Sequence, residues 1–158
     1  MSVQKRFKDM LVPVSKRIIE ECNNNLSERK CMALSAYMRS SFELIKKELI
    51  DTLEVITFIK PTRNEWEDIR ATCREFLELQ SEILKENSLR IWDHEHFNAD
   101  EFELLVREAA TEYNTFIDGQ LLNLVKTRRA LFFDILKRVL ATIIGSIIIY
   151  YLNKIFFR

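Results

Sequence analysis

The scarcity of turn-forming residues constrains this chain more than any other feature. Its 158 residues include only two glycines, Gly119 and Gly145, and two prolines, Pro13 and Pro61. Compact α/β and all-β domains need many tight turns, and glycine and proline supply most of them. Leu, Ile, Glu, Lys and Arg are abundant instead. The sequence therefore predicts an all-α protein, a bundle of about four long helices.

Apolar residues at helical spacing predict where the first two helices lie. A first helix follows from the apolar stripe that begins at Phe7, and Pro13 predicts a kink or a break near residue 12. The stretch NNNLS (23–27) is expected to connect it to a second helix, near Ser27 to Ile59. Pro61 biases the residue before it away from the helical region, so this helix should end there.

Capping patterns predict the starts of two further helices. Thr62 and Glu65 form a T-x-x-E capping box at the head of a third helix, which Asn87 and Ser88 are expected to end. Asn98 and the acidic residues after it suit the start of a fourth. No proline follows Asn98, so the fourth helix is expected to continue to the end of the chain. A break near Gly119 or Lys126 is the alternative.

The chain closes with a nearly continuous apolar run, RVLATIIGSIIIYYLNKIFFR (138–158). Nineteen helical residues, 139–157, would extend about 28 Å, close to the roughly 30 Å of a bilayer core, with Lys154 reaching the interface. This predicts a single C-terminal transmembrane helix in a juxtamembrane and membrane segment, 130–158, after a bundle of residues 1–129. A buried core helix is the alternative.

Basic residues before the span predict its orientation, because positive charge is retained on the cytoplasmic side. The N-terminal bundle is therefore expected in the cytoplasm. The residues expected to anchor the helix at the membrane interfaces are Lys126, Arg128, Arg129, Lys137, Tyr150, Tyr151 and Lys154.

Charge is unevenly distributed along a chain whose formal net charge is zero. Residues 1–64 carry 12 basic and 8 acidic side chains, residues 65–118 carry 5 and 15, and residues 119–158 carry 7 and 1. The acidic middle would repel a phosphate backbone, which disfavours nucleic-acid binding. The basic ends could meet anionic lipid headgroups, which makes a lipid bilayer the expected partner.

A narrow strip of small and polar residues follows one side of the terminal helix. Polar groups in a hydrocarbon environment need partners, and a single span has none in its own chain. Other copies of the chain could supply them, so the strip predicts a homo-oligomer, and with four or more copies it could line a pore. Back-bonding of Ser and Thr to their own helix is the alternative. The residues of this polar strip are Arg138, Thr142, Gly145, Ser146, Ile149 and Asn153.

The stretch RIWDHEH (90–96) holds both histidines of the chain, His94 and His96. Their H-x-H spacing with flanking carboxylates could bind a divalent metal, but no further histidine completes such a site. The simpler interpretation is that Arg90 and the histidines tie a loop to the bundle. We therefore expect no metal, and because phosphate-binding and nucleophile motifs are also absent, no cofactor and no enzymatic activity.

Arg90 and His96 also resemble the R-x4–6-H motif of HEPN ribonucleases, which are small helical bundles. The resemblance covers about seven residues and implies that these two residues could meet across a dimer to cleave RNA. Ile91 stands where that family prefers a polar residue after the arginine. Arg90 and His96 are accordingly the only catalytic candidates.

In layout, the whole chain resembles small single-span effectors of bacterial anti-phage and CRISPR-associated defence. The resemblance implies an oligomeric effector in the bacterial inner membrane, whose terminal helices form a pore gated by the cytosolic bundle and an unidentified cytosolic regulator or ligand. The alternatives are a passive tail-anchored adaptor that recruits partners to a membrane and a membrane-tethered ribonuclease. The Bcl-2 family shares the layout, but its N-W-G-R signature is missing.

Overall fold

The chain folds into long α-helices, as the composition predicts. The computed structural model describes the backbone of residues 2–28, 34–92 and 97–156, and their side chains except those of 25–28, 91 and 147–156. Within these ranges the elements are α1 (Val3–Glu28), α2 (Leu34–Thr57), α3 (Arg63–Ile91) and α4 (Ala99–Phe156). The described residues contain no strand. The prediction of an all-α bundle is confirmed.

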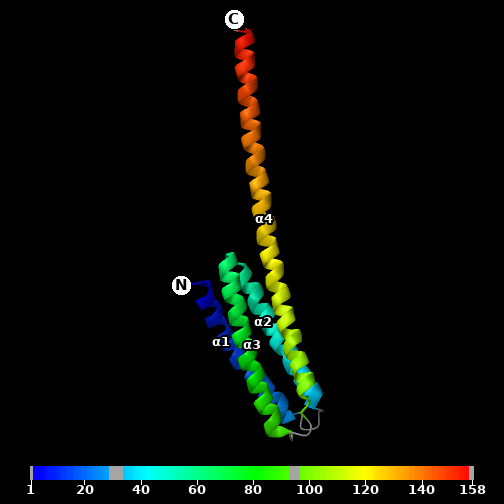
Figure 1. Cartoon of the computed structure of the whole chain (residues 1–158). Helices are drawn as coiled ribbons and strands as arrows, with labels where there is room; N and C mark the ends of the chain where they lie inside the picture. The colour runs from blue at the N-terminus through cyan, green and yellow to red at the C-terminus, as the bar shows by residue number, and fades with distance from the viewer. Residues whose placement is uncertain (1, 29–33, 93–96, 157–158) are drawn as a thin grey trace. The chain divides into compact units, whose positions relative to one another are not determined.

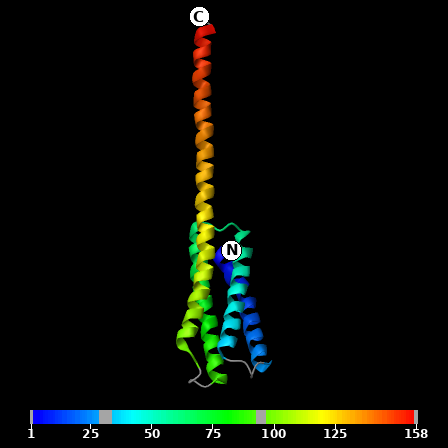
Figure 2. The ribbon, with the colours of Figure 1, turned by 90° about the vertical axis from the view of Figure 1, so that its right-hand side faces the viewer.

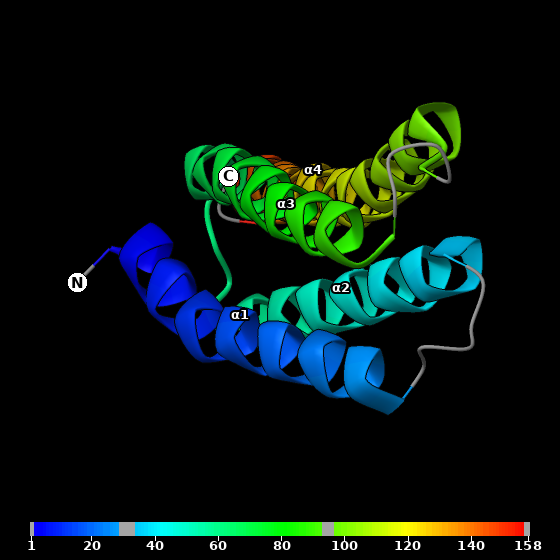
Figure 3. The ribbon, with the colours of Figure 1, turned by 90° about the horizontal axis from the view of Figure 1, so that it is seen from below.

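The chain divides into two compact units, a bundle unit (Met1–Gly119) and a terminal unit (Gln120–Arg158). The sequence had suggested a boundary ten residues later, between 129 and 130. In the bundle unit, successive helices alternate in direction, and α1, α2, α3 and the first part of α4 run side by side (Figures 1 and 2). Seen from below, α1 and α2 form one layer, while α3 and the beginning of α4 form the other (Figure 3).

The apolar stripes predicted for the helices form the core of the bundle unit. Its largest fully buried side chains are Trp66, Tyr37, Phe7 and Phe42. Ile19 and Ile83, which lie beside buried residues in the sequence, are only partly buried. The α4 residues buried in this core are Phe102, Leu105, Ala109, Tyr113 and Ile117. Burial of these side chains is the main force that holds the four helical segments together.

Aromatic contacts join the start of α4 to both neighbouring helices. Phe102 packs edge-to-face on Phe42 of α2, with ring centroids 5.4 Å apart. Phe116 lies 6.5 Å from Trp66 of α3. Both separations fall in the range in which aromatic pairs attract each other. These contacts fix the first part of α4 in the bundle.

The predicted capping signals mark two helix starts correctly. Glu65 N–H donates to Thr62 Oγ1 at 3.4 Å, and Thr62 N–H donates to Glu65 Oε2 at 2.8 Å, which completes the capping box of α3. At the start of α4, Glu101 N–H donates to Asn98 Oδ1 at 3.1 Å. Each cap satisfies helical N–H groups that have no carbonyl partner inside the helix.

Three predicted interruptions are wrong. α1 continues through Pro13 and through the asparagines of NNNLS to Glu28, so neither ends the helix. The kink expected at Pro13 as the alternative to a break stays a prediction. α3 continues past Ser88 to Ile91, because the Ser88 hydroxyl is buried and donates to the Leu84 carbonyl at 2.8 Å. A polar residue that bonds back to its own helix in this way is compatible with the helix interior.

The predicted transmembrane helix and single-pass membrane localisation are contradicted. Among the residues that the structure describes, no helix combines the length and the apolarity needed to cross a bilayer. The last helix is continuous from Ala99 to Phe156, as expected. However, Lys137, Arg138 and Lys154 limit its uncharged stretch to residues 139–153. Fifteen residues extend only about 22 Å, against roughly 30 Å of hydrocarbon. The predicted anchoring of the bundle in a bacterial inner membrane depended on this span, so it is not supported either.

Candidate functional site: the apolar surface of the terminal unit

Large apolar side chains are exposed along the described part of the terminal unit. Between residues 120 and 146, eleven of them are open to solvent, and Phe132 and Ile135 are more than 60% exposed. Monomeric proteins seldom expose contiguous apolar patches larger than a few hundred Å². The eleven residues are Leu122, Val125, Leu131, Phe132, Phe133, Ile135, Leu136, Val139, Leu140, Ile143 and Ile144.

The hydroxyl groups of the predicted polar strip are bonded within their own helix. Thr142 Oγ1 donates to the Arg138 carbonyl at 2.9 Å, and Ser146 Oγ donates to the Thr142 carbonyl at 2.9 Å. The Arg138 guanidinium lies 3.7 Å from the Asp134 carboxylate, four residues earlier. A Cβ atom added at Gly145 would meet nothing within 4 Å. This part of the strip therefore does not depend on a second chain to satisfy its hydrogen bonds.

The remaining residues of that prediction divide into two groups. The side chains of Lys126, Arg128, Arg129 and Lys137 are exposed. Those of Ile149, Tyr150, Tyr151, Asn153 and Lys154 lie outside the described residues. The anchoring role predicted for the basic and tyrosine residues required a membrane span, and the described residues contain no helix suited to one.

The described residues do not define a catalytic or metal site around Arg90, His94 and His96. Arg90 is exposed in the last turn of α3, whereas His94 and His96 lie outside the described residues. In the part of the chain that is described, no group of three His, Cys, Asp or Glu side chains is placed to hold a metal ion. The relation between Arg90 and His96 stays a prediction.

Burial makes two of the cysteines poor nucleophiles. Cys22 and Cys73 are both buried and both carry free thiols. Burial raises the pKa of Cys73 to about 12, and it also raises the pKa of Cys22, whose neighbours include Ser41 and Tyr37. Since the thiolate is the reactive form, neither thiol is suited to nucleophilic chemistry near neutral pH. Cys31 lies outside the described residues.

Ion pairs within the bundle unit join basic residues of α2 and α3 to acidic residues of α4. Arg39 of α2 lies 2.9 Å from Glu101, and Arg70 of α3 lies 2.5 Å from Asp118. The largely buried Lys46 side chain pairs with Glu43 and, at 3.5 Å, with Glu112 of α4. The hydrogen bond to Glu43 raises the pKa of Lys46.

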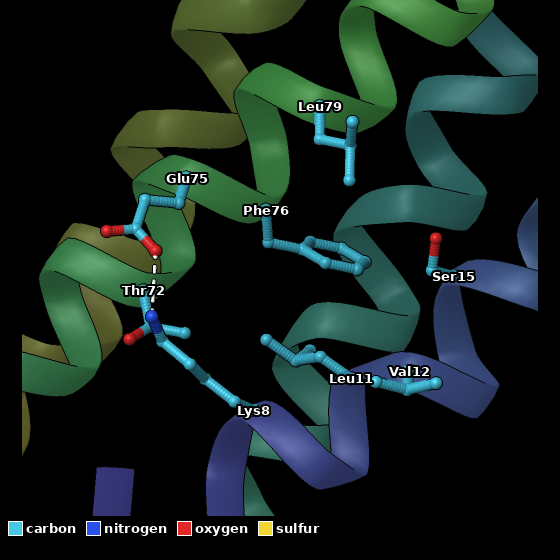
Figure 4. A pocket seen from close by; sticks show the side chains of 8 residues that line it. All are labelled: Lys8, Leu11, Val12, Ser15, Thr72, Glu75, Phe76 and Leu79. Carbon is cyan, nitrogen blue, oxygen red and sulfur yellow. Dashed lines mark hydrogen bonds and ion pairs between the residues drawn. The ribbon is translucent and has the colours of Figure 1, made fainter. Parts of the chain in front are cut away.

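A groove between α1 and α3 is a second candidate, which the sequence did not indicate. It has a volume of about 310 Å³ and is lined by Leu11 and Val12 of α1 and by Phe76 and Leu79 of α3 (Figure 4). Val12 is 69% exposed and lies beside the predicted apolar stripe of α1. Val12 was the sequence signal that could have indicated this groove, because it is an apolar residue beside the buried stripe. Singly exposed apolar residues are common on protein surfaces, so Val12 alone does not indicate a groove.

Polar groups at this groove are already paired within the chain. Lys8 forms an ion pair with Glu75 at 3.1 Å, which Figure 4 shows at one end. Ser15 Oγ accepts a hydrogen bond from Gln80 Nε2 at 2.6 Å. The groove thus offers a small apolar floor without a polar group that would select a ligand. The exposed surface of the terminal unit is far larger and is the stronger candidate.

Comparisons with known proteins found no match: no family model fits the chain, and no curated protein or solved structure is significantly similar to it.

Proposed function

We propose that this protein is a self-assembling helical protein whose copies associate through their terminal units. The observation that carries the proposal is the set of eleven exposed large apolar side chains between Leu122 and Ile144. The hydrophobic effect favours removing such a surface from water, and another copy of the same surface is present at equal concentration.

The available area is sufficient for a stable complex. At roughly 100 Å² for each half-exposed Leu, Ile, Val or Phe side chain, eleven side chains amount to about 1,100 Å² per chain. A standard protein interface buries about 800 Å² per partner. Association that buries most of this surface would therefore reach the range of specific complexes.

Like charge opposes this association and gives it a distinctive salt dependence. Residues 119–158 carry seven basic side chains and one acidic side chain. Salt screens repulsion between exposed charges, with a Debye length near 10 Å at about 0.1 M and near 3 Å at about 1 M. Assembly through this unit should strengthen as salt rises, whereas a complex held by ion pairs would weaken.

The proposal keeps the oligomeric part of the effector prediction. The pore and the tail-anchored adaptor both required the membrane span, so neither is part of it. A role in anti-phage defence, a regulatory ligand, and ribonuclease activity through Arg90 and His96 stay predictions from the sequence.

Sedimentation velocity of the full chain tests the proposal. We expect species larger than a monomer at micromolar concentrations, with more assembly at 1 M than at 0.1 M NaCl. The triple variant Phe132→Ser, Phe133→Ser, Ile143→Ser should sediment as a monomer. The matched control replaces exposed apolar residues of the bundle unit, Val12→Ser, Leu79→Ser and Leu104→Ser, and should assemble like the native chain. A monomeric native chain, or equal assembly of both variants, would refute the proposal.

A further inference from the structure

Five of the eleven exposed apolar residues of the terminal unit lie on one line along the helix. Val125, Phe132, Leu136, Val139 and Ile143 follow one another at intervals of seven, four, three and four residues. This is the spacing that keeps side chains on one line along a helix and that forms the seam between associated helices. These five residues are termed the apolar seam.

Charged and small residues, together with the exposed Leu131, occupy the side away from the seam. Arg138 follows Leu136 by two positions, about 200° around the helix. Asp134 and Ala141 lie on the same side as Arg138 by the same periodicity. The ion pair between Asp134 and Arg138, at 3.7 Å, runs along this side, so its charges are paired in the single chain.

From this arrangement we infer that the interface between copies is the apolar seam, and that the side bearing Arg138 and Gly145 faces away from it. The inference rests on the proposed self-assembly. It centres the contact roughly 100° around the helix from the polar strip that the sequence suggested, with Ile135 on the flank that borders the strip. Thr142 and Ser146 have no unmet hydrogen-bonding need that a partner copy would satisfy, since both hydroxyls donate to carbonyls of their own helix.

The width of the apolar side indicates more than two copies. Phe133, Ile135 and Leu140 flank the seam and are all exposed in the single chain. A two-stranded seam covers about two positions in every seven, whereas a helix surrounded by several neighbours needs about three or more. A second helix alone would leave these flanking side chains in water. An assembly of three or more terminal units can cover both the seam and its flanks.

Four of the six charged residues between 126 and 138 lie away from the seam. Lys126 and Lys137 are among them, so their charges stay in water when the seam is covered. Arg128 and Arg129 flank the seam between Val125 and Phe132, where their long side chains can reach water at the edge of the contact. Were Lys137 in the contact instead, each copy would bring a desolvated positive charge against the same charge of its neighbour. Burying unpaired like charges is strongly unfavourable.

Cysteine protection in the full-length assembly tests which side is covered. Single variants Leu136→Cys and Ile143→Cys report on the seam, and their controls Arg138→Cys and Ala141→Cys report on the opposite side. Maleimide labelling rates are measured in the assembled state and again in urea, and the native chain provides the background from its own cysteines. We expect labelling at least tenfold slower at the two seam positions than at the two controls in the assembly, and equal rates in urea.

The possible outcomes separate this inference from the proposed function. Slow labelling at Arg138→Cys and Ala141→Cys in an assembled chain would overturn the seam and leave self-assembly intact, as would equal rates at all four positions. A chain that sediments as a monomer would overturn both. If Leu136→Cys itself prevents assembly, Val139→Cys replaces it, and its fast labelling in the assembly would also refute the inference. A particle of two copies would refute the inferred stoichiometry.

Discussion

Two isoleucines of the same helix provide the sharpest test of the division between fold and assembly. Ile117 of α4 is fully buried in the bundle unit, and Ile143 of the terminal unit is 51% exposed. The same substitution, isoleucine to alanine, removes three carbon atoms at either position. Its effect should therefore depend only on what surrounds each side chain. Ile117→Ala should destabilise the folded chain, and Ile143→Ala should weaken assembly.

The expected magnitudes follow from burial. At about 0.8 kcal/mol per buried methylene, Ile117→Ala loses roughly 2.4 kcal/mol, and the cavity left behind brings the total to about 2–5 kcal/mol. For Ile143→Ala in a separate chain the change should stay within about 0.5 kcal/mol, since the side chain is half in water. In the assembly, covering the exposed half of Ile143 accounts for about half of that 2.4 kcal/mol, so Ile143→Ala should weaken association by about 1.2 kcal/mol per copy, or roughly eightfold.

Urea unfolding and sedimentation measure the two effects separately. Unfolding is followed by circular dichroism at a concentration low enough to leave the chains unassociated. With a urea m-value of about 1–3 kcal/mol per molar, Ile117→Ala should lower the midpoint by about 1 M or more. Ile143→Ala should leave that midpoint unchanged and raise the concentration needed for assembly.

The opposite pattern would refute this reasoning. If Ile143→Ala destabilised the dilute chain as much as Ile117→Ala, the terminal unit would be covered within a single chain. If neither substitution affected assembly, the apolar surface would not be the contact. Circular dichroism of each variant before unfolding serves as the control for helix content.

Three further predictions concern the bundle unit. Thr62→Ala should lower the free energy of unfolding by about 1 kcal/mol. The hydrogen bonds from Thr62 lower the pKa of Glu65 from 4.5, so the cap stabilises the native chain above pH 4.5 and this stabilisation is lost as the pH falls below it. Parallel profiles of stability against pH for the native chain and the variant would contradict this. Tyr37 Oη is buried without a hydrogen-bond partner among the described residues. Tyr37→Phe should therefore leave the free energy of unfolding in urea unchanged or raise it by up to about 1–2 kcal/mol. A clear loss of stability would be inconsistent with that burial. Burial raises the pKa of Cys73 from 9.0 to about 12, so the buried neutral thiol contributes fully to folding stability below pH 9, and this contribution is lost as the pH rises toward 12. The unfolding temperature of Cys73→Ala should therefore fall less steeply over that range than that of the native chain. An identical slope would contradict the burial.

Local signals predicted the elements of this fold well. The capping box of Thr62 and Glu65 and the cap of Asn98 depend on residues three positions apart, so the sequence alone was sufficient to find them. Ser88 shows where this approach fails. Its hydroxyl can either end a helix or donate to the carbonyl four residues earlier, and its burial in the bundle decides between the two.

The candidate site was predicted only in part. The sequence located the exposed apolar residues within the last helix but assigned the contact to its polar strip. Whether Thr142 and Ser146 need outside partners depends on the rotamers of their hydroxyl groups, which sequence spacing does not specify. The α1–α3 groove was missed because it requires two helices that are distant in sequence to lie beside each other.

The sequence by itself determined that this protein is helical, roughly where its helices begin, and which stripe of each is apolar, because these properties depend on residues within one or two turns of each other. The tertiary structure decided which apolar residues a single chain covers. Ile117 and Ile143 are the same residue type on the same helix, yet only Ile117 has α2 and α3 packed around its part of α4. Covering a side chain takes neighbours from elsewhere in the chain, and the described part of the terminal unit leaves its apolar side chains in water.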